Sequence, residues 1–254
     1  MRKTDEPRNV GLARALSKMG VCSRSQASEI IRRGQVAVNG SVRRDPESPV
    51  RLERDRIEID GWTQTSRTKV YLMLNKPRGV VTSAADEKGR ETVYACLAEG
   101  MPWVGPVGRL DKGSEGLLLL TNDSEWAARV LSPETHLSKT YHVQIGTVAD
   151  EALLGRLARG VRTPEGELLR MKSAKVLRGG KKNTWLEVIL DEGKNRHLRR
   201  MFAALDIEVL RLVRVAVGRL VLGDLPKGKA RPLSAAEKQM LDAEMNMAKA
   251  QERR

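Results

Sequence analysis

One stretch of the chain combines a carboxylate with an irregular backbone. Residues 105–116 contain four glycines, carry Asp111 and run directly into the apolar residues 117–120. Glycines permit backbone conformations that other residues avoid, and loops beside rigid elements often present functional side chains. Asp111 is therefore our candidate catalytic carboxylate. On spacing alone, a turn acid beside a surface arginine, Arg109, fits equally well.

A second carboxylate, Glu115, follows Asp111 by four residues. Paired carboxylates cleave glycosidic bonds, so hydrolysis of a small sugar is one activity that the two residues allow. Four residues across a glycine-rich loop do not fix the distance between the carboxyl groups. At the level of the sequence, the two-carboxylate interpretation stays open.

Two glycine-containing segments, one of them the Asp111 stretch itself, resemble nucleotide-binding motifs only in part. Residues 223–229 have the spacing of a phosphate-binding loop, but Ala230 stands where the motif needs a metal-binding Ser or Thr. Residues 105–116 lack the Gly-x-Gly-x-x-Gly pattern and no helix is expected after them. Neither a nucleoside triphosphatase nor a dinucleotide-fold methyltransferase is therefore expected.

The first 60 residues predict a small helix-helix-hairpin domain. Residues 11–19 have helical apolar spacing and end at a glycine. Ser23 and Gln26 form a capping-box pattern that starts a second helix, which runs to about residue 33. Asn39-Gly40 between alternating valines predicts a hairpin turn. Basic side chains that suit an RNA stem lie on or beside these elements, at Arg24, Arg32, Arg33, Arg43 and Arg44.

A larger domain follows a polar linker over residues 61–70. Its strands and helices mix without a regular βαβ repeat, so we predict a mixed α/β (α+β) fold with a largely antiparallel sheet. The predicted domains are residues 9–60, 71–233 and a C-terminal helix and tail over 234–254. The expected elements are strands at 70–74, 80–82, 139–145, 184–190, 209–217 and 220–222, a turn at 75–79, helices at 151–159 and 196–205, and a capping box at 234–237.

Composition indicates the class of partner. The 254 residues carry 46 Lys and Arg against 32 Asp and Glu, a formal charge of +14, which favours nucleic acid ahead of an anionic membrane surface. Only 3% of residues are aromatic, so phosphate contacts should outweigh base stacking on a sheet. Two distant cysteines and the absence of zinc-ligand spacing or a long apolar run predict a cytoplasmic protein without a disulfide, a metal or a membrane span. A monomer is the default.

Several segments together resemble one enzyme family. Residues 20–40 resemble the alpha-L RNA-binding module of a small-subunit ribosomal protein. The Asp111 segment resembles the central motif of the ribosomal RNA pseudouridine synthases that carry this module. Further motifs of the family match in order at residues 74–79 (Leu-Asn-Lys-Pro-Arg-Gly), 139–141 (Lys-Thr-Tyr), 192–202 (Glu-Gly-Lys-Asn-Arg-His-Leu-Arg-Arg-Met-Phe), 213–218 and 225–233.

The resemblance implies isomerisation of a uridine in ribosomal RNA, with the large subunit favoured. The N1–C1′ bond breaks, the uracil turns, and C5 bonds to C1′, so the reaction needs no cofactor. Asp111 would act as nucleophile or as base toward the ribose, and the sequence does not choose between these roles. A small-subunit target, a pre-ribosomal particle as substrate, or a non-catalytic ribosome-assembly protein are the alternatives.

Matching positions assign further roles. Arg199 would pair with Asp111 and keep it ionised, because a buried carboxylate is costly without a cation. Tyr141 would stack on the target base and assist removal of the C5 proton, and Leu212 would pack against the uracil. His197 stands where the family often has Gln, and a surface helix histidine is the simpler expectation. The other implied substrate-binding residues are Arg109, Lys194, Arg196 and Lys76.

Overall fold

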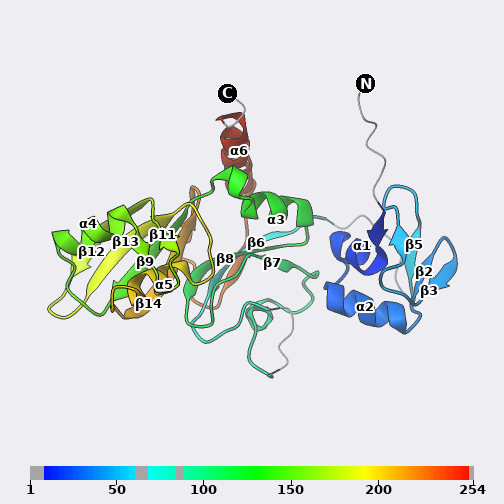
Figure 1. Ribbon diagram of the computed structural model, residues 1–254. Helices are drawn as coiled ribbons and strands as arrows, with labels where there is room; N and C mark the ends of the chain where they lie inside the picture. The colour runs from blue at the N-terminus through cyan, green and yellow to red at the C-terminus, as the bar shows by residue number, and fades with distance from the viewer. Residues whose placement is uncertain (1–8, 61–67, 84–87, 252–254) are drawn as a thin grey trace. The chain divides into compact units, whose positions relative to one another are not determined.

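The computed structural model of the chain describes residues 9–60, 68–83 and 88–251 (Figure 1). By contacts the chain divides into two compact units: residues up to 70 with 99–105 and 121–124, and residues 71–98, 106–120 and 125–254. The first seven positions of the predicted linker, 61–67, lie outside the described residues. In the described part of the chain, no helix has both the length and the apolar character needed to cross a membrane.

The first unit contains the predicted helix-helix-hairpin arrangement. The capping box at the start of the second helix is confirmed, because the Ser23 hydroxyl accepts from the Gln26 amide at 3.2 Å and the Gln26 side chain accepts from the Ser23 amide at 3.0 Å. Apolar side chains such as Leu16 and Ile31 are fully buried between the helices and the sheet. The elements are β1 (Val10–Gly11), α1 (Leu12–Lys18), α2 (Arg24–Arg32), β2 (Val36–Val38), β3 (Ser41–Arg43), β4 (Pro49–Val50) and β5 (Ile57–Ile59).

A nine-stranded sheet forms the centre of the second unit. Seven strands run in the order β12-β13-β9-β14-β8-β6-β16, while β15 pairs with β14 and β7 pairs with β8. Strand β14 pairs antiparallel with β9 and parallel with β8, so it joins the two halves of the sheet. The strands are β6 (Tyr71–Lys76), β7 (Gly105–Val107), β8 (Glu115–Thr121), β9 (Lys139–Ile145), β12 (Ser173–Gly179), β13 (Thr184–Leu190), β14 (Val209–Val217), β15 (Leu220–Val221) and β16 (Ala230–Pro232).

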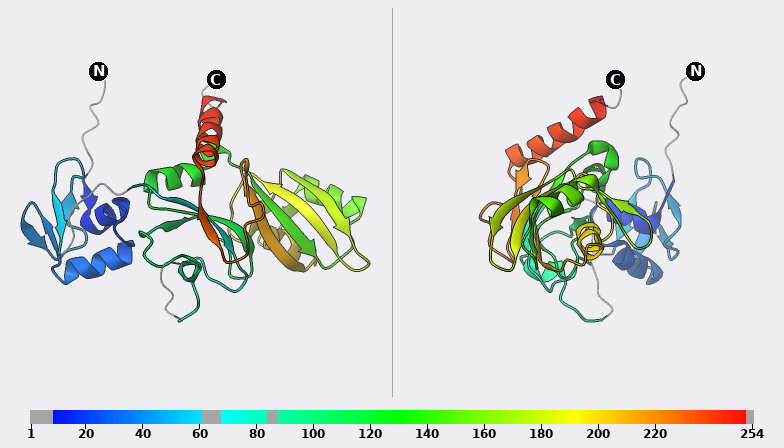
Figure 2. Two further views of the ribbon diagram at one scale, coloured as in Figure 1. Left: turned by 180° about the vertical axis from the view of Figure 1, so that it is seen from behind. Right: turned by 60° about the vertical axis from the view of Figure 1, so that its left-hand side comes forward.

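Helices bury the two halves of this sheet separately (Figure 2). One apolar core joins α4 and α5 to the alternating inward residues of β9 and β13. A second core joins α3 and α6 to β6 and β8. The helical and remaining short elements are α3 (Ser124–Leu131), α4 (Glu151–Arg159), α5 (His197–Ala203), α6 (Ala235–Gln251), the 3₁₀ turns Val93–Cys96 and Pro133–Thr135, and the strand pair β10 (Val161–Arg162) and β11 (Leu168–Leu169).

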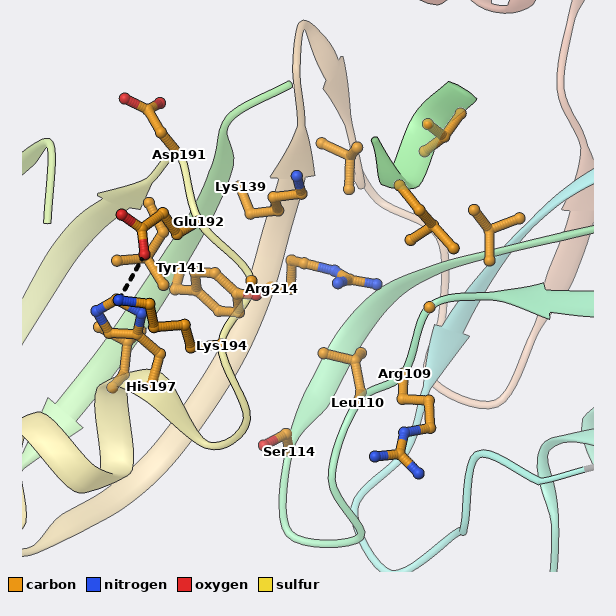
Figure 3. A pocket seen from close by; sticks show the side chains of 18 of the residues that line it. Arg109, Leu110, Ser114, Lys139, Tyr141, Asp191, Glu192, Lys194, His197 and Arg214 are labelled. Carbon is orange, nitrogen blue, oxygen red and sulfur yellow. Dashed lines mark ion pairs between the residues drawn. The ribbon is translucent and has the colours of Figure 1, made fainter. Parts of the chain in front are cut away.

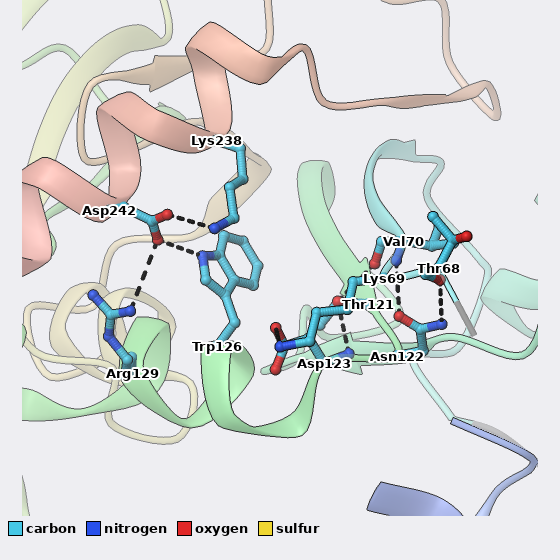
Figure 4. A network of polar contacts seen from close by, with 10 residues as sticks. All are labelled: Thr68, Lys69, Val70, Thr121, Asn122, Asp123, Trp126, Arg129, Lys238 and Asp242. Carbon is cyan, nitrogen blue, oxygen red and sulfur yellow. Dashed lines mark hydrogen bonds and ion pairs between the residues drawn. The ribbon is translucent and has the colours of Figure 1, made fainter. Parts of the chain in front are cut away.

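Polar contacts fix the C-terminal helix and the start of the sheet (Figure 4). In the second unit, Asp242 of α6 accepts from the Trp126 indole at 2.9 Å and from Lys238 at 2.5 Å. In the first unit, the Asn122 side chain accepts from the Val70 amide at 2.8 Å. The bonds from Trp126 to Asp242 and from Val70 to Asn122 each join positions that are more than 50 residues apart in the sequence.

The predicted fold class is confirmed, and so are several elements. The strand at 139–145, the helix at 151–159 and the strands at 184–190 and 209–217 have the bounds that the apolar spacing indicated. The predicted turn at 75–79 is partly wrong, because Asn75 and Lys76 continue β6. The Asn75 amide donates to the Lys229 carbonyl at 3.0 Å, which extends the β6–β16 pairing past the apolar residues.

Gly116, at the start of β8, lies where β8 and β14 approach each other closely. Its φ is +101°, and a Cβ there would lie 2.2 Å from the Arg214 carbonyl oxygen. We expect Gly116→Ala to lower the free energy of unfolding by about 3 kcal/mol or more. The matched control is Gly79→Ala, since Gly79 has φ +96° with nothing within 4 Å of the added Cβ. Equal losses for both variants in urea unfolding would show that backbone strain alone matters at Gly116.

Candidate active site

A pocket of about 860 Å³ in the second unit collects most of the predicted substrate-facing residues (Figure 3). Its lining comes from the segment 107–114, from β9 and β14, from residues 130–136 and from the segment 190–198. The predicted residues that line it are Arg109, Asp111, Tyr141, Lys194, Arg196 and Leu212. Residues more than 100 positions apart therefore surround one cavity.

The loop that carries Asp111, residues 109–114, is held by hydrogen bonds that other segments donate to its backbone carbonyls. All five consecutive carbonyls from residue 110 to residue 114 accept a hydrogen bond from a donor elsewhere in the second unit. In loop order the donors are the Thr82 hydroxyl to Leu110, the Lys76 ammonium to Asp111, the Gly79 amide to Lys112, the Arg199 guanidinium to Gly113 and the Lys76 ammonium to Ser114. A loop with so many fixed carbonyls presents its carboxylate in one orientation.

Lys76 is the central donor of this arrangement. Its side chain is 0% exposed, and Nζ lies 3.1 Å from the carbonyl oxygens of Pro77 and Asp111 and 2.8 Å from that of Ser114. Burial lowers the pKa of Lys76 to about 8, against an opposing attraction from Asp111. The prediction that Lys76 binds substrate is wrong, because Lys76 does not line the pocket and its ammonium is bonded to three backbone carbonyls. It supports the Asp111 loop from beneath.

The cation that pairs with Asp111 is Arg196. Its Nη1 lies 3.5 Å from Asp111 Oδ2, whereas Arg199 donates to the carbonyls of Gly113 at 2.9 Å and Val209 at 3.3 Å. The predicted ion pair between Arg199 and Asp111 is therefore not formed. Arg196 immediately precedes α5 and Arg199 lies in its first turn, so one helix start supplies a cation to the carboxylate and a donor to its loop.

The wall opposite this loop comes from β9 and β14. Tyr141 and Arg214 are paired across the two strands, and both line the pocket with Leu212 and Lys139. Arg214 is buried and its Nε donates to the Leu117 carbonyl at 2.7 Å. Burial and, less strongly, Arg214 lower the pKa of Lys139. Sequence reasoning missed Arg214 and Lys139, although strand alternation places Lys139 on the same face as Tyr141.

Glu115 does not act as a second catalytic carboxylate. Its side chain is 3% exposed, and Arg211 donates to both its oxygens at 3.1 Å while Lys227 also bonds one of them. Burial raises the pKa of Glu115, but the bonds from Arg211 and Lys227 outweigh burial and hold this pKa below its ordinary value. Because Glu115 does not line the pocket, the two-carboxylate interpretation is wrong.

Two further predictions concern histidine and the first unit. His197 was expected on the surface of its helix, but it is 4% exposed and lines the pocket, because α5 turns its first residue inward.

The five arginines assigned to RNA are all exposed on the first unit. Arg33 pairs with Glu29, one turn before it on α2.

Removing the buried ammonium should loosen the Asp111 loop. We expect Lys76→Met to lower the free energy of unfolding at pH 7 by about 2–4 kcal/mol, since the carbonyls of Pro77, Asp111 and Ser114 lose the hydrogen bond from Lys76. The pKa of Lys76 is about 8 in the folded protein, against the ordinary value of 10.5 that applies to the unfolded chain. Between pH 8 and pH 10.5 the folded state therefore binds fewer protons than the unfolded state, and stability rises with pH. Wild-type stability should therefore rise over the variant's by about 2 kcal/mol from pH 8 to pH 10.

The control for this experiment is Lys112→Met, which removes an exposed ammonium from the same loop. It should leave both the stability at pH 7 and its pH dependence unchanged. Equal unfolding curves for Lys76→Met and Lys112→Met would contradict the supporting role of Lys76.

Comparison with known proteins gives one consistent result. Residues 70–204 match the family model of RNA pseudouridylate synthase, and residues 10–57 match that of the S4 domain. The chain is 38% identical over 234 residues to ribosomal large subunit pseudouridine synthase B of Bacillus subtilis, covering 91% of this chain and 95% of the relative. It is 35% identical to the Haemophilus influenzae protein of the same name, covering 90% of this chain and 66% of that protein.

A solved structure gives the same result for the fold. A crystal structure of a pseudouridylate synthase superposes with a TM-score of 0.63 and 30% identity, covering 91% of this chain and 99% of that one. The family model spans the Asp111 loop, Tyr141 and the start of α5, which together surround the pocket. The chain belongs to the RNA pseudouridylate synthase family.

Proposed function

We propose that the protein converts one uridine of large-subunit ribosomal RNA to pseudouridine in the cytoplasm, with Asp111 as the catalytic carboxylate. Membership of the family makes the chain an isomerase that acts on uridine in RNA. Similarity over nearly the whole length to enzymes named for the large ribosomal subunit supports that substrate. The observation that carries the proposal is the fixed loop that presents Asp111 to a pocket beside Tyr141 and Leu212.

The reaction rearranges bonds within one nucleotide. The N1–C1′ bond breaks with its electron pair on the uracil, the base turns, C5 bonds to C1′, C5 loses a proton and N1 gains one. Asp111 serves this sequence as nucleophile at the ribose or as base toward it. Arg196, with Nη1 3.5 Å from Asp111 Oδ2, places a cation beside the carboxylate that acts in either role.

The pocket walls suit a uracil that has left its stack. Flipping a base costs a few kcal/mol, which stacking and apolar contact in the pocket must offset. Tyr141 would stack on the uracil and assist removal of the C5 proton, while Leu212, 6% exposed, would pack against it. Arg109, Lys194 and Arg196 line the pocket and would hold the flanking phosphates.

The first unit supplies a second contact with RNA. We assign it to a stem near the target, through Arg24, Arg32, Arg33, Arg43 and Arg44, and keep residues 9–60, 71–233 and 234–254 as the functional division of the chain. We propose that the protein acts as a monomer.

Pseudouridine mapping tests the activity. Ribosomal RNA from cells without this protein should lack one pseudouridine that the wild type restores and Asp111→Asn does not, because the variant keeps the shape but loses the carboxylate. Asp224→Asn, which neutralises an exposed aspartate, is the matched control and should restore the site.

Three outcomes would correct the proposal. Restoration by Asp111→Asn would remove Asp111 from catalysis. A missing site in the small-subunit RNA would change the target. If no site changes, the chain would be an RNA-binding assembly factor.

The salt dependence of RNA binding tests the role of the first unit. Changing Arg24, Arg32 and Arg43 together to Gln should weaken binding of the target RNA fragment and reduce the slope of log affinity against log salt by about 2–3, since each phosphate contact contributes about 0.7–0.9. Fluorescence anisotropy from 50 to 300 mM salt measures this slope. An unchanged slope would place the RNA contacts elsewhere.

The control removes the same number of positive charges from other positions of the first unit. Changing Arg51, Arg54 and Arg56 to Gln removes three other exposed arginines of that unit. This control should leave the slope within error of the wild-type value.

A further inference from the structure

His197 is the one side chain, among those that the structure describes around the pocket, whose buried polar atoms all lack a hydrogen-bond partner. It is 4% exposed, and neither Nδ1 nor Nε2 meets a partner in hydrogen-bond geometry. A buried polar atom without a partner costs free energy that a ligand can recover. The ring lies at the end of the pocket that Tyr141, Glu192 and Lys194 also line (Figure 3).

The surroundings of the ring set its charge. Burial lowers the pKa of His197 below the ordinary 6.5, the Arg170 backbone, Glu192 and Glu167 oppose that shift, and Lys194 adds to it. Both glutamates are already engaged, because Lys194 pairs with Glu192 at 2.9 Å and with Glu167 at 3.3 Å. The ring is therefore neutral at pH 7, with one nitrogen that donates and one that accepts.

The Arg170 backbone opposes the lowering of the pKa of His197, but it is not in hydrogen-bond geometry with either ring nitrogen. Whichever nitrogen carries the hydrogen, the other one is an acceptor. Tyr141 and Lys194 also line this end of the pocket, and neither is in hydrogen-bond geometry with the ring.

From this arrangement we propose that His197 accepts a hydrogen bond from an N–H or O–H of the target nucleotide. Two groups of a uridine have this chemistry, the imide N3–H of the base and the 2′-hydroxyl of the ribose. The inference rests on the proposed function and adds to it one substrate-contacting residue. The contact forms only when the His197 ring is neutral, because the protonated ring has no acceptor nitrogen. A non-titrating acceptor such as Gln would serve at pH 7 but would give a different pH profile.

The first experiment compares pH profiles of kcat/KM on the ribosomal RNA fragment that contains the mapped site. The wild-type rate should fall as the pH drops through the lowered pKa of His197, since protonation removes the acceptor. His197→Gln should keep the rate at pH 7 within about threefold and lose that fall. His197→Leu should be slower by on the order of tenfold at all pH values.

The second experiment identifies the group that donates. Binding of fragments with 2′-deoxyuridine or N3-methyluridine at the target is measured in the Asp111→Asn background, so that no turnover occurs. The analogue that lacks the true donor should weaken binding to the protein with His197 and have no such effect when His197 is also changed to Leu. This cycle isolates the contact from general effects of either change.

The outcomes separate the inference from the function on which it rests. If the wild type forms no pseudouridine, the proposed function fails. If the wild type is active but His197→Gln and His197→Leu keep its pH profile, or both analogues lose equal affinity with and without His197, the nucleotide contact is wrong. Circular dichroism of each variant shows whether a lost rate reflects a lost fold. If His197→Leu does not fold, the pH profile of His197→Gln decides whether His197 contacts the nucleotide.

Discussion

The buried ammonium of Lys76 is the interaction on which the site depends. A glycine-rich loop gains little from side-chain packing and loses much conformational entropy when it is fixed. Lys76 compensates for this loss by donating to the carbonyls at both ends of the 111–114 turn, and Arg199 binds the carbonyl between them. The position of Asp111 is thus set by backbone contacts, and its carboxylate stays available to substrate and to Arg196.

The sheet explains why these donors meet the loop. Strand β6 brings Lys76 beneath the loop, β8 leaves the loop, and β14 lies against both β8 and the β9 strand of Tyr141. Gly116 makes this possible, because only a residue without Cβ fits against the Arg214 backbone. Glu115 then fastens the start of β8 to Arg211 of β14. The catalytic loop and the base-binding wall are therefore parts of one framework.

Local pattern predicted the elements well and the site contacts less well. Alternation and apolar spacing identified β9, β13, β14 and α4, and capping chemistry identified α2. Contacts between distant segments were out of reach: a lysine and an arginine in matching motifs look alike whether they bind RNA or backbone carbonyls, so Lys76 and Arg199 were assigned to the wrong partners. The inward turn of His197 depends on the packing of α5, which sequence spacing does not reveal.

The central claim is that the Asp111 loop is already in its working position before RNA binds. Crystal structures of the enzyme alone and with its target RNA fragment test this most directly. We predict that the backbone of residues 109–114 superposes within about 1 Å, with Lys76 on the same carbonyls in both. A loop that is rearranged in the free enzyme, or a Lys76 that leaves those carbonyls when RNA binds, would contradict the account.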